Sequence, residues 1–208
     1  MIIIQEWWGL DFEIKSHAKK LSELTDCQVV IPDLYRGKVG SEAEEAQHLM
    51  SNLDFQGAIT DIVSCCAFLK EQGLAKVGIA GFCMGGVLSI ASAIKAGTGG
   101  FAAVAPFYGY NPDLGDVSTL TCPIQGHFGI KDNYPISDAT AVSTLEEKLK
   151  SASVESEIFV YEKVGHGFMN ATPEGIERKV KLGQGSHDQE AVDLAWARLT
   201  AFFAKHLN

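Results

Sequence analysis

Apolar runs of strand length alternate with longer, mixed stretches along the whole chain. Six such runs cover residues 2–5, 28–31, 76–80, 102–107, 123–128 and 157–161, and they lack the regular apolar-polar alternation of half-buried strands. Four other segments repeat apolar residues at helical spacing, in stripes that begin at Ile14, Phe55, Val142 and Val192. Strands buried on both faces and separated by helices indicate right-handed βαβ units. The pattern therefore predicts an α/β fold, with a mostly parallel sheet of about six strands and helices on both faces.

The same pattern predicts where the functional residues lie. In a parallel sheet, ligands bind beyond the carboxyl ends of the strands. A polar or aromatic residue follows each predicted strand, in chain order Glu6 and Trp7, Arg36, Cys83, Tyr108, Asp132 and His166. Because parallel strands end at one edge of the sheet, these side chains are expected to gather there.

The third predicted strand runs into a sharp turn with a cysteine at its tip. Residues 81–85 read Gly-Phe-Cys-Met-Gly, which is a nucleophile elbow with cysteine in the nucleophile position. Glycine is needed two positions before and two positions after Cys83, because those positions pass close together in the turn. The turn places the sulfur at the N-terminus of the next helix, which favours the thiolate. A small buried cysteine is the alternative interpretation of Cys83, and it leaves the glycines unexplained.

A thiolate nucleophile needs a base and a group that orients the base. In α/β-hydrolases the chain order is nucleophile, acid, histidine, and Cys83, Asp132 and His166 follow that order. His166 lies between two glycines, which is typical of a loop rather than a core. Asp132 precedes Asn133, so an ordinary turn aspartate is the alternative there. The sequence predicts that Asp132 holds His166 in the tautomer that faces the sulfur.

Composition and charge narrow the class of protein. The chain of 208 residues is 46% hydrophobic and 21% charged, which suits a single domain spanning residues 1–208. Its formal net charge of −9 argues against a nucleic-acid partner. No apolar run approaches the roughly 18 residues of a membrane span, and the five cysteines fit no disulfide framework or zinc site. We therefore expect a cytoplasmic protein with reduced thiols, and neither a metal nor a membrane partner.

Four ordered motifs resemble the dienelactone hydrolase family over essentially the whole chain. They are Gln5-Glu6-Trp7-Trp8-Gly9-Leu10, Pro32-Asp33-Leu34-Tyr35, Gly81-Phe82-Cys83-Met84-Gly85-Gly86 and Gly165-His166-Gly167-Phe168. The resemblance implies an α/β-hydrolase fold and hydrolysis of enol-lactones and related esters by a Cys-His-Asp triad, without a cofactor. It also implies that Glu6 lies beside the thiol and helps to generate or control the thiolate. The N–H groups of Met84 and Trp7 would form the oxyanion hole, and the Met84 half also follows from the elbow.

The chain departs from the family pattern at two places. The resemblance implies two arginines that hold a substrate carboxylate, but one of those positions is Asn170 and the other aligns with Ala43. Arg36 and Lys38 could take over that role, or could be solvated loop residues. The second departure is the start of the chain: the N-terminal β-hairpin that usually precedes the glutamate-bearing strand is absent. Either the protein is naturally shortened or the sequence is truncated.

The function expected from these features is hydrolysis of a small-molecule ester or lactone by a monomer or weak oligomer. The predicted substrate-binding residues and candidate pocket walls are Arg36, Tyr108, Phe168, Trp7, Trp8 and Tyr134. A non-catalytic ligand-binding protein or a thiol redox sensor on the same fold is the alternative. A redox sensor often pairs its thiol with a resolving cysteine, and no second cysteine lies in a predicted loop near Cys83.

Overall fold

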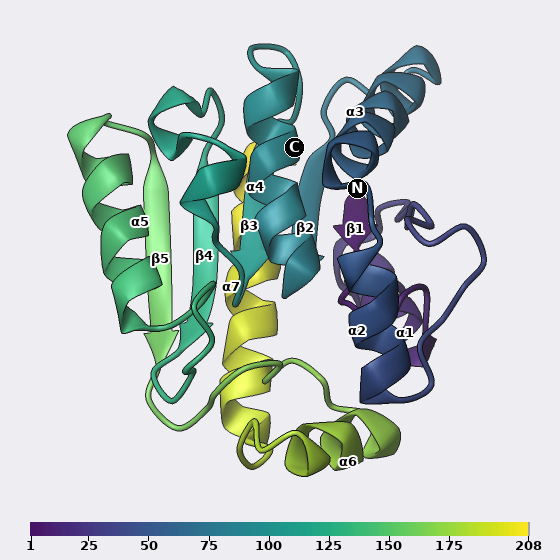
Figure 1. Cartoon of the computed structure of the whole chain (residues 1–208). Helices are drawn as coiled ribbons and strands as arrows, with labels where there is room; N and C mark the ends of the chain where they lie inside the picture. The colour runs from purple at the N-terminus through teal and green to yellow at the C-terminus, as the bar shows by residue number, and fades with distance from the viewer. Residues whose placement is uncertain (208) are drawn as a thin grey trace.

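The sheet consists of five parallel strands that follow one another in sequence order. The computed structural model describes residues 1–207. Its strands are β1 (Ile2–Ile4), β2 (Gly78–Phe82), β3 (Ala103–Phe107), β4 (Ile124–Gly129) and β5 (Ser156–Tyr161). They lie in the order β1-β2-β3-β4-β5, and every neighbouring pair is parallel (Figure 1). The predicted α/β class with a parallel sheet is confirmed.

The second predicted strand, residues 28–31, is not a strand, so the sheet has five strands where about six were expected. Val30 forms a single parallel bridge with Ile2. Two hydrogen bonds support it, from Ile3 N–H to Val30 O and from Val30 N–H to Met1 O, each 2.9 Å long. The run lies at the edge of the sheet beyond β1, where its apolar side chains are only half-buried. Pro32 follows directly and has no N–H with which to continue the ladder.

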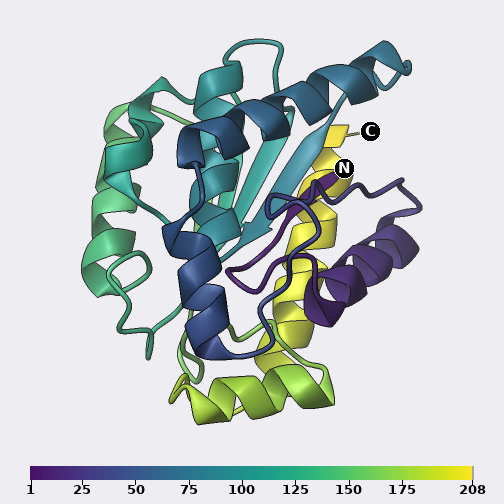
Figure 2. The ribbon, with the colours of Figure 1, turned by 45° about the vertical axis from the view of Figure 1, so that its right-hand side comes forward.

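In residues 1–207, seven α-helices surround the sheet. They are α1 (Phe12–Thr25), α2 (Ala43–Ser51), α3 (Phe55–Glu71), α4 (Met84–Ala96), α5 (Ala139–Ser151), α6 (Pro173–Lys181) and α7 (Gln189–Leu207), and two short 3₁₀ helices span Pro112–Leu114 and Val117–Thr119. Helices α1 and α7 pack on one face of the sheet, whereas α3, α4 and α5 pack on the other (Figure 2). Helix α6 lies beyond the carboxyl ends of the strands (Figure 1). None of the helices in this described part is both long enough and apolar enough to cross a membrane.

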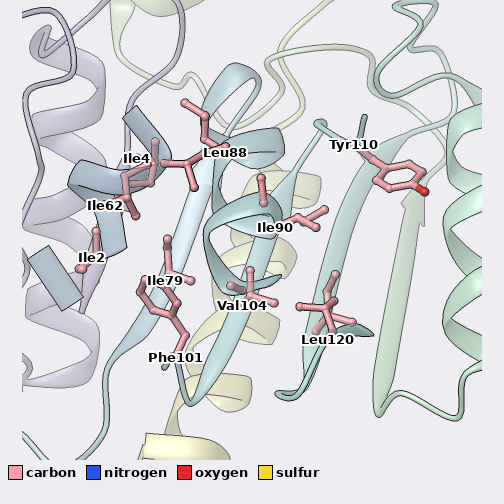
Figure 3. Packing of buried hydrophobic residues seen from close by; sticks show 14 of the residues in the cluster. Ile2, Ile4, Ile62, Ile79, Leu88, Ile90, Phe101, Val104, Tyr110 and Leu120 are labelled. Carbon is pink, nitrogen blue, oxygen red and sulfur yellow. The ribbon is translucent and has the colours of Figure 1, made fainter. Parts of the chain in front are cut away.

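The strands bury side chains on both faces, which explains why their sequences do not alternate. Ile2 and Ile4 of β1 belong to the core beneath α3 and α4, while the intervening Ile3 belongs to the core beneath α1 and α7. Figure 3 shows Ile2 and Ile4 in one cluster with Ile62 of α3 and Leu88 of α4. A strand covered by helices on both sides needs apolar residues at every position.

The four predicted helical stripes lie on α1, α3, α5 and α7 and face these two cores. Ile14 and Leu21 of α1 are buried on one side of the sheet, and Ile62 of α3 and Leu145 of α5 are buried on the other. The predicted covering of both faces is therefore confirmed, and the carboxyl ends of the strands are left for the loops that carry the polar residues.

Candidate active site

Cys83 sits at the tip of a strained turn between β2 and α4. Its backbone has φ 54° and ψ −117°, and a non-glycine residue adopts a positive φ of this kind only under constraint. A Cβ on Gly81 would lie 1.9 Å from the carbonyl oxygen of Gly85, and one on Gly109 would lie 2.1 Å from that of Cys83. The crowding expected between Gly81 and Gly85 is therefore present. Sequence reasoning did not single out Gly109, whose close approach depends on how β3 packs beside β2.

Cys83, His166 and Asp132 form one chain of hydrogen bonds. His166 Nε2 lies 3.1 Å from Cys83 Sγ, and His166 Nδ1 lies 2.8 Å from Asp132 Oδ2. The three residues follow β2, β5 and β4 respectively. The parallel sheet thus brings together, at its carboxyl edge, the three groups that the sequence predicts to meet there.

Further contacts hold the imidazole of His166 in place. Ser137 Oγ lies 3.2 Å from Nδ1, the nitrogen that also faces Asp132. The ring centroid of Tyr134 lies 4.4 Å from that of the imidazole, and the ring of Tyr108 lies 5.1 Å away in an edge-on arrangement. Sequence reasoning missed Ser137, because a serine in a loop belongs to no recognisable motif.

The charges of the site favour a protonated imidazole at His166. Burial alone would lower the pKa of His166, but the Cys83 sulfur raises that pKa well above its usual value. The sulfur also lies at the N-terminus of α4, where the helix dipole stabilises negative charge. Burial raises the pKa of the thiols of Cys65 and Cys66, and that of Cys122 to about 11.

Glu6 is a buried carboxylate beside the Cys83 and His166 pair. The hydroxyl of Tyr108 donates to Oε1 at 2.9 Å, and the amide of Asn170 donates to Oε2 at 3.1 Å. Burial raises the pKa of Glu6, whereas the hydrogen bond from Asn170 and the nearby imidazole of His166 lower it. Glu6 lines the same cavity as Cys83, which is the place that the family resemblance implies for it.

The loop that carries His166 is anchored by helix α1. His17 Nε2 lies 3.1 Å from the carbonyl oxygen of Met169, and Glu13 accepts the N–H of Ala171 at 2.9 Å. Both anchoring side chains are buried. They hold the segment directly after the histidine, so a helix near the start of the chain supports this loop.

A buried lysine packs behind the same loop. Lys179 of α6 is only 1% exposed, and its Nζ has no hydrogen-bond partner among residues 1–207. A Cβ on Gly167 would lie 3.4 Å from the Asn170 amide nitrogen and 3.8 Å from Lys179 Cδ, so the lysine stem reaches the loop beside Asn170. Burial lowers the pKa of Lys179, whereas the carboxylates of Glu6 and Glu13 raise it. Sequence reasoning missed this residue, which reads as one of several cations on an amphipathic helix.

A cavity of about 340 Å³ lies at Cys83 and His166. Its apolar walls are Met50, Phe55, Val87, Leu114, Pro135 and Ile136. Its uncharged polar residues are Gln47, Asn111, Tyr134 and Gln184. This volume is at the lower end of the roughly 300–1,000 Å³ that is typical of small-molecule sites. Among residues 1–207, no group of three or more His, Cys, Asp or Glu side chains is arranged to hold a metal ion.

Trp7 and Met84 both line this cavity. Met84 is the first residue of α4, so its N–H has no acceptor in a preceding helical turn. In the described part of the chain, no backbone acceptor outside the helices and strands takes the N–H of Trp7 or of Met84.

The sequence profile of the dienelactone hydrolase family matches residues 1–207. The chain belongs to the dienelactone hydrolase family. One curated relative, "Protein usf" of Aquifex pyrophilus, is 29% identical over 220 residues, which cover 100% of this chain and 88% of the relative. The carboxymethylenebutenolidase of Rhodococcus opacus is 28% identical over 195 residues, which cover 86% of this chain and 71% of the relative. The resemblance read from the four motifs is confirmed at the level of the family.

Solved structures agree with the family fold. A dienelactone hydrolase-like promiscuous phosphotriesterase from metagenomic libraries has a TM-score of 0.81 and 17% identity, covering 100% of this chain and 86% of the other. The dienelactone hydrolase of Anabaena variabilis has a TM-score of 0.67 and 16% identity, covering 100% and 87%. At this level of identity the likeness concerns the α/β-hydrolase fold alone.

Three residues predicted to bind substrate do not line the cavity at Cys83, and neither does the candidate pocket wall Trp8, which lines a separate cleft. Arg36 lies on an exposed loop, forms an ion pair with Asp61 and faces a separate cavity. Tyr108 and Phe168 are fully buried in the core on the α1 and α7 side of the sheet. The sequence shows that Arg36 and Tyr108 follow predicted strands and that Phe168 follows His166. It does not show in which direction these side chains point.

Helix α2 presents Gln47, rather than Ala43, to the cavity. Ala43 is the first residue of α2 and lines a separate cleft together with Arg178. Gln47 and Met50, one and two turns further along the helix, line the cavity at Cys83. The residue that α2 offers to a substrate is thus Gln47, which is uncharged like Ala43.

Proposed function

We propose that this member of the dienelactone hydrolase family hydrolyses a small carboxylic ester or lactone, with Cys83 as the nucleophile. The observation that carries the proposal is the unbroken hydrogen-bond chain from Asp132 through His166 to Cys83 Sγ. That chain ends at a strained elbow beside a cavity of small-molecule size, and strain of this kind clusters at active sites. The name of the Rhodococcus opacus relative, a carboxymethylenebutenolidase, supports a lactone among the substrates.

In the first half of the reaction the acyl group moves to Cys83. The thiolate attacks the carbonyl carbon, and a C–S bond forms while the carbonyl oxygen takes up negative charge. When the tetrahedral intermediate collapses, the C–O bond to the leaving alcohol breaks and His166 Nε2 gives its proton to that oxygen. The products are a thioester on Cys83, a neutral His166 and an alcohol, which stays attached to the acyl chain when the substrate is a lactone.

In the second half, water releases the acyl group. Neutral His166 accepts a proton from a water molecule as its oxygen attacks the thioester carbon. The C–S bond then breaks, which restores the Cys83 thiolate and the protonated His166, and the carboxylic acid product loses its proton to solvent. Asp132 holds the Nδ1 side of the ring through both steps, so that Nε2 always faces the reacting atoms.

Two further groups take part in this scheme. The N–H groups of Trp7 and Met84 would donate to the carbonyl oxygen as it becomes negative, which is the usual role of an oxyanion hole. Glu6, whose carboxylate lies beside the Cys83 and His166 pair, would set the electrostatic balance between thiol and thiolate. This assignment follows the family resemblance and agrees with the burial of Glu6 at the cavity.

A thiol redox sensor or a non-catalytic binding protein is the alternative function on the same fold. A sensor usually needs a resolving cysteine near the reactive one. In residues 1–207, Cys83 is the one cysteine that lines the cavity. A buried histidine held by an aspartate is what acyl transfer requires, whereas reversible oxidation of a thiol does not require it. These observations favour the hydrolase.

A panel of aryl esters and simple lactones tests the proposal, with intact-protein mass spectrometry to detect the acyl-enzyme. We expect the wild type to turn over at least one substrate and to show a transient mass increase equal to the acyl group. Cys83→Ala should show neither, while its circular dichroism spectrum stays unchanged. Full activity in Cys83→Ala would exclude the mechanism. A wild type that cleaves nothing, but whose Cys83 is reversibly oxidised by peroxide, would favour the sensor.

A further inference from the structure

The cavity at Cys83 lacks a permanent positive charge. Among residues 1–207, neither a lysine nor an arginine lines it. Besides Cys83 itself, the titratable residues that line it are Glu6, His166 and Tyr134. His166 already has Cys83 on one ring nitrogen and Asp132 on the other. A substrate carboxylate that entered this cavity would therefore find a competing carboxylate in Glu6 and no free cation.

Three cations, Arg178, Lys179 and Arg36, lie outside this cavity. Arg178 lies 2.7 Å from Asp11, stacks over the ring of Trp8 and lines a separate cleft. Lys179 is fully buried among carboxylates and does not reach the cavity. Arg36 is held by its own ion pair on an exposed loop. None of these three side chains is placed to accept a charged group of a substrate bound at Cys83.

The walls of the cavity suit an uncharged hydrocarbon group instead. Met50, Phe55 and Val87 reach it from three different helices, and Leu114 and Ile136 reach it from the segments after β3 and β4. A carboxylate pressed against these side chains would lose its hydration without gaining a partner, which is strongly unfavourable. An apolar acyl group would gain from the same contacts.

We infer that this site takes neutral esters or lactones with an apolar acyl part, and that it discriminates against acyl groups that carry a carboxylate. The inference rests on the proposed function and narrows its substrate class. The apolar acyl group contacts the same cavity walls in the ground state and in the transition state, so these contacts stabilise both states. The discrimination should therefore appear in kcat/KM.

A matched pair of substrates tests the inference. Both are p-nitrophenyl esters of the same short dicarboxylic acid, one with its second carboxyl free and the other with that carboxyl capped as a methyl ester. We expect the capped, neutral substrate to be hydrolysed with a kcat/KM higher by about 30-fold or more, because the free carboxylate is left unpaired. The preference should persist at high ionic strength, since it arises inside the cavity and not from the net charge of the protein.

Gln47→Arg is the corresponding gain-of-function variant, with Gln47→Met as its uncharged control. An arginine on this face of α2 supplies the missing partner, so the ratio of the two kcat/KM values should shift toward the anionic substrate by about tenfold or more. Gln47→Met should leave the ratio as in the wild type. A ratio that is the same in all three proteins would show that Gln47 does not face the acyl group and would overturn this assignment of the cavity.

The remaining outcomes are distinguishable. Hydrolysis of neither ester would overturn the proposed function, and the inference would fall with it. Hydrolysis of both with the anionic ester preferred would overturn the inference alone. In that case, kinetics of Arg36→Ala and Lys179→Met on the same pair of esters would identify the cation that binds the substrate carboxylate.

Discussion

The side-chain amide of Asn170 donates a hydrogen bond to Glu6 Oε2 at 3.1 Å and so joins the loop of His166 to the end of β1. An amide satisfies a carboxylate oxygen but brings no charge. Tyr108, which donates to the other oxygen of Glu6, is equally uncharged. Glu6 is therefore a buried carboxylate with two neutral partners, and its ionisation depends on positive charge further away. The imidazole of His166 lowers the pKa of Glu6, and Glu6 in turn raises the pKa of the buried Lys179, so the two charges act on each other.

Replacing Lys179 by methionine removes one of those cations while it keeps an apolar stem of similar length. Burial then acts on Glu6 with less positive charge nearby, so the pKa of Glu6 should rise further. Infrared difference spectra recorded against pH should show the C=O band of a protonated carboxyl group persisting to higher pH in Lys179→Met. The band should be absent from the Lys179→Met/Glu6→Gln double variant.

Glu13 provides the control for this experiment, because it is the other carboxylate that raises the pKa of Lys179. If the carboxyl band of Lys179→Met persists when Glu6→Gln is added but disappears when Glu13→Gln is added, the protonated group is Glu13. Lys179 would then act on the contact between α1 and the loop, and the prediction for Glu6 would be contradicted. Lys179→Arg keeps the charge and should return the band to its wild-type pH range.

Cys83 should be the only fast-alkylating thiol, and its reactivity should persist at acidic pH. Because the Cys83 sulfur raises the pKa of His166, the imidazole keeps its proton through the neutral range and stabilises the thiolate as the pH falls. We expect the rate of iodoacetamide labelling to change by less than about threefold between about pH 8 and pH 6. In His166→Ala the rate should fall about tenfold per pH unit below about pH 8.5, the pKa of an unpaired thiol. Faster labelling of Cys65 or Cys122 by peptide mapping would contradict the assignment.

Asp132 and Ser137 both contact His166 Nδ1, at 2.8 Å and 3.2 Å, but they should differ in their effect on turnover. Asp132→Asn removes the charge that stabilises the imidazolium and should lower kcat by about 10³–10⁴-fold. Ser137→Ala removes one neutral contact and leaves the carboxylate, so kcat should fall by less than about tenfold. Steady-state kinetics on an aryl ester, with circular dichroism as the check of folding, measures both. Equal losses would show that the two contacts act as one unit.

The sequence was sufficient to predict the features that are local in the chain. The elbow around Cys83 is encoded within five residues, and its glycines have a steric reason that the structure bears out at Gly81 and Gly85. The strand runs could be recognised because burial on both faces forces apolar residues at every position. From those two features, the rule that functional groups follow parallel strands places Asp132 and His166 at the same edge.

The features that were missed depend on tertiary contacts. Ser137 contacts His166 across 29 residues of sequence, and Lys179 is buried only because α6 folds over the loop beside Asn170. Tyr108 follows a strand like the other site residues, yet its ring turns into the core and only its hydroxyl reaches Glu6. The direction of a side chain, and its contacts with residues far away in the sequence, produce no periodic pattern from which they could be predicted.

The contact between Gly109 and Cys83 gives a direct test of the elbow. A Cβ on Gly109 would lie 2.1 Å from Cys83 O and 2.9 Å from Val87 N, and neither backbone atom can move without shifting the nucleophile. Gly109→Ala should therefore lower the free energy of unfolding by about 2 kcal/mol or more and slow the alkylation of Cys83. Gly115→Ala is the matched control, because its Cβ would come closer than 3 Å only to Cδ1, the flexible end of the Ile94 side chain. The stability of this variant should stay within about 1 kcal/mol of the wild type. Denaturant titration and iodoacetamide labelling measure the two effects, and a Gly109→Ala protein with wild-type stability and labelling would contradict this geometry of the elbow.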